Sequence, residues 1–235
     1  MMELFNEILF RPLFNLTVFL YNILPGNDFG LAIVVLTFII KLVFFPLTSK
    51  SIRSQKKLSQ LNPQIKQIKE KYKSDQRAQS EATLALYREN GVNPIAGCFP
   101  LLIQIPILIG LYQAFIAGLK PESLSMLYSF IGNPGTINGL SFGFIEIASK
   151  MPLLAVISGG LQFIQSKKSS GQLQGAGAGQ EMKALNAQML YFFPIMVIII
   201  GWNLPAGLVI YWLATTAFSI VEQMYINKRQ TTSIK

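Results

Sequence analysis

The sequence contains no histidine and only one cysteine, Cys98, among its 235 residues. Without imidazole there can be no histidine-based proton relay or metal site, and a single cysteine cannot form an internal disulfide. Acidic residues are also scarce, with 11 Asp and Glu against 20 Lys and Arg. The apolar stretches hold no paired carboxylates and no Ser and Lys dyad, and no glycine-rich phosphate loop follows a strand. We therefore expect a protein that is not an enzyme and that uses no cofactor or metal.

What the sequence has in abundance is apolar residues. It is 51% hydrophobic and only 13% charged, with a mean hydropathy of +0.42. These values indicate an all-α polytopic membrane protein, because a helix of about 20 apolar residues crosses the hydrocarbon core of a bilayer. Five segments qualify as transmembrane helices, the fourth of them short: residues 29–49, 95–117, 147–166, 187–202 and 205–223.

The segments outside these spans differ in character. Residues 1–28 predict an interfacial amphipathic helix, since their apolar run is too short to span a membrane and is broken by Arg11 and two asparagines. Residues 50–94 predict a basic helical hairpin, with Asn62 and Pro63 at the start of a helix. The remaining segments are a loop at 118–146, a flexible Gly, Ser and Gln-rich loop at 167–186, and a basic tail at 224–235.

The distribution of positive charge predicts the orientation in the membrane. Sixteen lysines and arginines fall in the hairpin, the flexible loop and the tail, whereas three fall on the other side. By the positive-inside rule, these three segments and the C-terminus are cytoplasmic and the N-terminus is outside. The basic residues of the hairpin have three open interpretations: a topology signal, a contact with anionic lipids, or a contact with ribosomal RNA.

One charge lies inside an apolar run. Lys41 is the only charged residue between Phe29 and Leu47, in the stretch LAIVVLTFIIKLVFFPLTSK. A lysine near the centre of a span costs about 3 kcal/mol, so its side chain should face protein or water. The alternative is snorkelling, in which the long side chain reaches the headgroups near Lys50.

Other polar residues accompany Lys41 in the predicted spans. Thr37 lies one helical turn before it and shares its face. Gln104, Gln162, Tyr211 and Trp212 lie in the second, third and fifth spans. Each alone is typical of a hydrogen bond between helices. Together with Lys41 they predict a polar surface within the bundle that water can enter.

Three long segments resemble the YidC/Oxa/Alb family of membrane protein insertases. They are TFIIKLVFFPLTSKSIRSQKKLSQLNPQIKQIKEKYK, NPIAGCFPLLIQIPILIGLYQAF and NLPAGLVIYWLATTAFSIVEQ. The resemblance extends from Phe29 over nearly all of the following chain. The large extra domain and additional N-terminal span of some relatives are not expected here.

The resemblance implies a role for several residues. Lys41 occupies the position of the family's positively charged residue, usually an arginine, in a hydrophilic groove open to the cytoplasm and to lipid. Lysine keeps the charge but lacks the planar fork of arginine. Thr37 and Trp212 fall at positions that contact substrate in relatives, and Gln162 is a weaker correspondence. Gln104 and Tyr211 join this groove on the polar pattern alone.

The predicted function is that of an insertase in a bacterial plasma membrane. Short hydrophilic segments of nascent proteins would pass through the groove while the hydrophobic helix enters the bilayer. The expected partners are nascent membrane proteins and anionic lipids, with the ribosome and the general translocon as further candidates. Two alternatives stay open: an assembly chaperone for helices already inserted, and a small-solute transporter.

Overall fold

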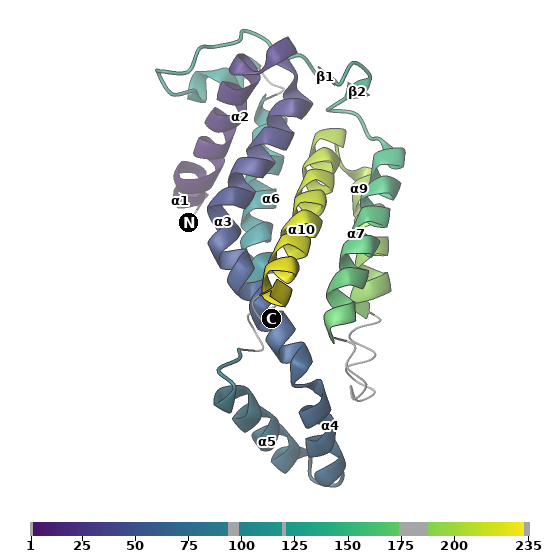
Figure 1. Ribbon diagram of the computed structural model, residues 1–235. Helices are drawn as coiled ribbons and strands as arrows, with labels where there is room; N and C mark the ends of the chain where they lie inside the picture. The colour runs from purple at the N-terminus through teal and green to yellow at the C-terminus, as the bar shows by residue number, and fades with distance from the viewer. Residues whose placement is uncertain (1, 94–98, 119–120, 174–187, 233–235) are drawn as a thin grey trace.

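The computed structural model describes residues 2–93, 99–118, 121–173 and 188–232, which form a helical bundle with a smaller helical pair projecting from one end (Figure 1). The described residues confirm the all-helical class, with one minimal pair of strands. The bundle contains α1 (Met2–Phe5), η1 (Asn6–Phe10), α2 (Arg11–Ile23), η2 (Pro25–Asn27), α3 (Phe29–Gln60), α6 (Phe99–Gly118), α7 (Pro152–Leu173), η5 (Gln188–Phe192), α9 (Phe193–Asn203) and α10 (Ala206–Thr232). The projecting pair is α4 (Asn62–Lys71) and α5 (Gln76–Glu89).

The helices α3, α6, α7, α9 and α10 each overlap one predicted span. Among the described residues, only α3 is long and apolar enough to cross a membrane by itself, and Ile103–Ala117 and Leu190–Asn203 are shorter apolar helical stretches. The five-span count therefore stays a prediction. Two helices extend past the predicted span ends, because α7 continues to Leu173 and α10 to Thr232. Residues 174–186 of the predicted flexible loop lie outside the described residues, as do residue 187 of the predicted fourth span and Cys98.

The N-terminal helices lie lengthwise beside the bundle rather than across its end (Figure 1). One face of α2 is buried, including Phe14 and Val18, and Leu13 contacts the backbone of α6 at Gly110. The sequence predicts a helix lying flat on the membrane surface. In the structure the apolar face of this amphipathic helix is covered by α3 and α6. Its placement on the membrane surface stays a prediction.

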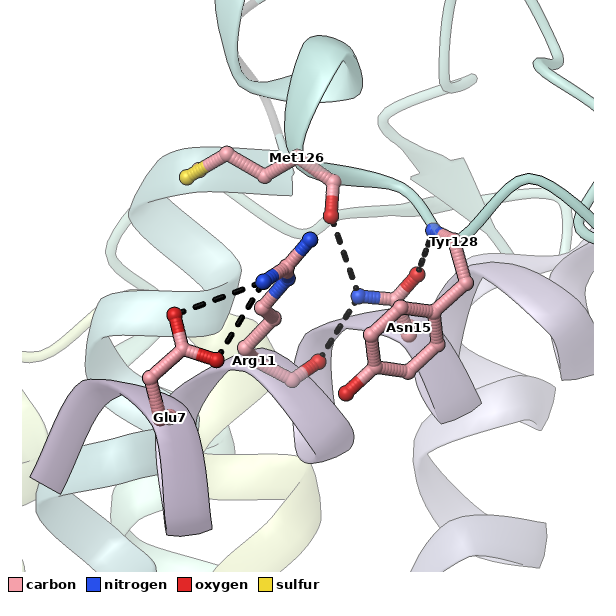
Figure 2. A network of polar contacts seen from close by, with 5 residues as sticks. All are labelled: Glu7, Arg11, Asn15, Met126 and Tyr128. Atoms are coloured by element: carbon pink, nitrogen blue, oxygen red, sulfur yellow. Dashed lines mark hydrogen bonds and ion pairs between the residues drawn. The ribbon is translucent and has the colours of Figure 1, made fainter. Parts of the chain in front are cut away.

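A network of polar contacts joins this N-terminal helix to the loop after α6 (Figure 2). Asn15 donates from Nδ2 to the carbonyl oxygen of Met126 (3.3 Å), and its Oδ1 accepts from the backbone N–H of Tyr128 (2.6 Å). Arg11 pairs with Glu7 (3.2 Å) and lies 5.2 Å from the centre of the Tyr128 ring. A buried asparagine with both ends of its amide bonded fixes the loop against α2.

The start of α3 is fixed by a second set of polar contacts. Asp28 caps the helix by accepting from the N–H of Leu31 (2.9 Å), and its other oxygen accepts from the N–H of Phe142 (2.5 Å). Partial burial acts to raise the pKa of Asp28, but these hydrogen bonds, with others from Ser141 and Gly30, outweigh it and hold the pKa below its usual value. The carboxylate thus ties the first turn of α3 to the hairpin of β1 (Leu140–Ser141) and β2 (Ile145–Glu146).

At the same end of the bundle, backbone hydrogen bonds join the start of α10 to the residues that follow β2. The N–H of Ala206 donates to the carbonyl oxygen of Ser149 (2.8 Å), and that of Gly207 to Ile147 (3.1 Å). A Cβ on Gly207 would lie 2.7 Å from the Ile147 side chain, so only glycine permits this approach. We call this the outer end of the bundle, and the opposite end, from which α4 and α5 project, the hairpin end.

The projecting pair has a small core of its own. Leu61, Ile65 and Val92 are buried there, with Leu58, Leu86 and Tyr87 packed against them. Leu61 separates α3 from α4, and Pro63 lies in the first turn of α4. Asp75 caps α5 by accepting from the N–H of Ala78 (2.9 Å). So small an apolar cluster supports only modest local stability.

Candidate functional site

A partly open cavity of about 40 Å³ lies between α3, α6 and α10, with room for a few water molecules. It is lined by Thr37, Ile40, Lys41, Phe44, Thr48, Ile103, Gln104, Ile107, Tyr211 and Thr215. The first five come from α3, three from α6 and two from α10. Four of the six residues predicted from the sequence, Lys41, Thr37, Gln104 and Tyr211, therefore meet around one space.

Lys41 points from α3 towards α10. Its Nζ donates to the Ser219 hydroxyl at 2.6 Å, and that hydroxyl in turn donates to the carbonyl oxygen of Thr215 (2.8 Å). The ammonium group is thus held by the neighbouring helix within the bundle. This contact favours the interpretation in which Lys41 faces protein or water over the one in which it snorkels.

The far wall of the cavity is formed by a second polar pair. Gln104 donates from Nε2 to the hydroxyl oxygen of Tyr211 at 2.5 Å, which links α6 to α10. Tyr211 is almost fully buried, so its hydroxyl needs such a partner. The Thr37 hydroxyl donates to the Ile33 carbonyl oxygen one turn earlier (2.7 Å). The Thr37 hydroxyl proton is therefore used within α3, and the Thr37 side chain forms part of the cavity wall.

The other two predicted residues lie elsewhere. Gln162 of α7 accepts through Oε1 from the Thr216 hydroxyl (3.3 Å), on a different face of α10 from the cavity. Further along the same interface, Gln223 donates to the Ser169 hydroxyl at 3.0 Å. Trp212 is half-buried and is not among the residues that line the cavity. Helical spacing shows which residues share a face, but it does not say which helix that face meets.

Sequence reasoning missed Thr48, Ser219 and Glu222. The Thr48 hydroxyl donates to Oε1 of Glu222, and Glu222 interacts electrostatically with Lys41. A signal was present, because Glu222 is the single acidic residue in α3, α6, α7, α9 and α10. Thr48 also shares a face of α3 with Lys41, since it follows about two turns later.

The chemistry available to this site is electrostatic. Within the described part of the chain, no three His, Cys, Asp or Glu side chains gather as metal ligands. What the cavity offers is one ammonium group, several hydroxyls and an amide inside a bundle with an apolar exterior. Such a site can hold water and attract a negatively charged or polar segment away from lipid.

An all-helical bundle with an internal polar cavity and many exposed apolar side chains is the architecture expected of a helical membrane protein. Comparison with known proteins then gives the family. A family model described as "60Kd inner membrane protein" matches residues 19–233, so the chain belongs to this family, the YidC/Oxa/Alb group. This confirms the family predicted from the three sequence segments.

Individual relatives agree with this assignment. A protein of Geobacter sp. (strain M21) described as "Membrane protein insertase YidC" is 37% identical, over 93% of this chain and 36% of its own length. A protein with the same description from Fusobacterium nucleatum subsp. nucleatum is 34% identical, over 86% of this chain and 88% of its own. MisCA of Bacillus subtilis (strain 168), also described as a membrane protein insertase, is 36% identical, over 86% of this chain and 72% of its own length. The chain spans little more than a third of the length of relatives such as the Geobacter protein.

Proposed function

We propose that this protein is a membrane protein insertase that moves short hydrophilic segments of nascent chains through the cavity between α3, α6 and α10. The observation that carries the proposal is Lys41, a lone ammonium group bonded to Ser219 beside a partly open cavity with room for a few water molecules. The printed descriptions of the relatives support the same activity.

The first step is entry of a polar segment from the hairpin end. Acidic groups in the segment are attracted to Lys41 by about 1 kcal/mol at 4 Å if the site is as wet as bulk water, and by more if it is drier. The hydroxyls and the Gln104 amide replace part of the segment's hydration. The cavity thereby shortens the apolar distance that the segment has to cross.

The second step is release of the hydrophobic helix into lipid. The outer faces of α3 and α10 offer an apolar path, with exposed side chains that include Phe38, Leu42, Met224 and Tyr225. Aromatic pairs, Phe38 with Phe218 and Phe45 with Tyr225, join the two helices along it. Burial of apolar surface contributes about 25 cal/mol per Å², so partition into lipid drives the reaction without a nucleotide.

The orientation follows from the charge distribution. The hairpin of α4 and α5, the loop after α7 and the C-terminus are cytoplasmic, and the outer end faces away from the cytoplasm across a bacterial plasma membrane. The hairpin carries exposed basic residues, among them Lys66, Lys71 and Arg77. These suit anionic lipid headgroups, and the ribosome and the translocon are further candidate partners.

The test is insertion of a single-span substrate with an acidic translocated segment into liposomes that contain only this protein. We expect insertion with the wild type and with Lys41→Arg, and a loss of at least fivefold, on the order of one close charge interaction, with Lys41→Ala and Lys41→Glu. Full activity of all variants would remove Lys41 from the mechanism. Binding of the substrate without movement of its polar segment would instead identify an assembly chaperone.

A further inference from the structure

Two hydrogen-bonded pairs of polar side chains link α3 to α10, and we call each pair a rung. In the first rung, Lys41 of α3 bonds Ser219 of α10. In the second, Thr48 of α3 bonds Glu222 of α10. Ser219 and Glu222 are three residues apart, so both face α3. The second rung thus places a carboxylate beside the site that attracts acidic segments.

Glu222 interacts with Lys41 but does not hold it. The two groups attract each other electrostatically, yet none of the ion pairs among the described residues joins them. The carboxylate is bonded to a hydroxyl and the ammonium to another hydroxyl. Each charge is therefore partly offset by the other, while the lysine stays able to exchange its neutral partner for a second anion.

Glu222 also lies ahead of Lys41 on the path from the hairpin end. Both α3 and α10 run from the outer end, where Asp28 and Ser149 hold their first turns, towards the hairpin end. Glu222 and Thr48 lie further along these helices than Lys41 and Ser219. A polar segment that enters there meets the negative charge before the positive one.

We propose that Glu222 is a specificity-determining residue of the insertase, a resident anion that competes with acidic substrate segments for Lys41. It limits the preference of the cavity for acidic segments and leaves neutral polar segments unaffected. This inference rests on the proposed function. The alternative is that Glu222 only ties α10 to α3 through Thr48.

The two roles separate in Glu222→Gln. The glutamine side chain keeps an oxygen that can accept from the Thr48 hydroxyl, so the tie between the helices is retained while the charge is lost. A structural role therefore predicts little change, whereas a competing anion predicts a change that depends on the charge of the substrate.

The experiment uses the purified full chain in liposomes and two single-span substrates, whose translocated segments differ only by two Asp residues in one and two Asn residues in the other. The readout is the ratio of acidic to neutral insertion. We expect Glu222→Gln to raise this ratio about fivefold, the effect of one unit charge a few ångström away in a wet site. The matched control is Glu89→Gln, which makes the same change on the exposed surface of α5 and should leave the ratio as in the wild type.

Insertion of the neutral substrate reports whether each variant is folded. An unchanged ratio in Glu222→Gln, or loss of both substrates together, would overturn the inference and leave Glu222 a structural residue. Failure of the proposed function looks different, because the wild type would then insert neither substrate above protein-free liposomes. A ratio that also rises in Glu89→Gln would count against a local effect and in favour of net charge.

Discussion

The interface between α7 and α9 is built from small residues, whereas that between α3 and α10 contains hydroxyl, ammonium and carboxylate groups. On the first, a Cβ at Gly159 would lie 2.3 Å from Cγ1 of Ile198, and one at Gly201 would lie 3.1 Å from the Ala155 side chain. On the second, Lys41 and Thr48 bond Ser219 and Glu222 beside a cavity. Close backbone packing leaves no room for water, whereas polar side chains hydrogen-bond across an interface and can also bind water in a cavity beside it. The α7 and α9 interface is therefore a close-packed one, whereas the α3 and α10 interface contains the charged and hydroxyl groups of the proposed site.

Access of water separates the two interfaces most sharply. In a Cys98→Ser background, a Thr215→Cys thiol would line the cavity, whereas Ile157→Cys would lie on the exposed outer face of α7, near the middle of its predicted span. Because the reactive thiolate forms only where water can reach it, we expect a water-soluble maleimide to label Thr215→Cys about tenfold faster or more. Labelling is followed by mass shift in liposomes. Equal rates would mean that the cavity is dry in the membrane.

The close packing of α7 on α9 is tested by adding one methyl group. Gly159→Ala forces Ile198 and the backbone at Pro194 to move, so we expect a loss of about 1–3 kcal/mol in the free energy of unfolding in mixed micelles. The neighbouring Gly160 offers the matched control, since no atom lies within 4 Å of its would-be Cβ. Gly160→Ala should be neutral or stabilising by up to about 1 kcal/mol, because alanine favours the helix. Equal losses in the two variants would show that the close approach of Ile198 to Gly159 does not decide the effect.

The outer end holds α3 in place through the Asp28 carboxylate, and its contribution depends on pH. Asp28→Asn keeps a cap but loses the charge, so we expect about 1 kcal/mol less stability at neutral pH. The pKa of Asp28 is lowered in the folded protein, so the wild-type advantage is full above the usual value of 3.8 and is lost as the pH falls through the folded value. Melting temperatures in detergent from pH 7 to pH 3 measure this. A difference that stays constant over this range would contradict it.

The hydrogen bond between Gln162 and Thr216 should have the smallest effect. Polar bonds between membrane helices contribute about 0.6 kcal/mol on average. A double-mutant cycle with Gln162→Met and Thr216→Val should therefore give a coupling energy of about that size, with insertion retained. Loss of insertion in Gln162→Met alone would return this residue to the groove in which the sequence pattern places it.

The sequence alone determined the helical class and the family, and it predicted the charged residue that lines the cavity. Apolar runs leave the backbone no option in lipid but helix, and the cost of burying a lysine predicts a functional role for Lys41. Thr37 could be assigned to the same face because the helical repeat is a local property. Asp75 and Pro63 likewise mark helix starts through local chemistry.

Only the tertiary structure decided which polar residues meet. Gln104 and Gln162 look alike in the sequence, yet one bonds Tyr211 at the cavity and the other bonds Thr216 on a different side of α10. The N-terminal helix shows the same limit, since its amphipathic pattern suits a membrane surface and a bundle equally well. The reason is physical: helical periodicity fixes directions within one helix, whereas the partner across each interface depends on how the helices pack. The pairing of Thr48 with Glu222, far apart in the chain, became visible only through that packing.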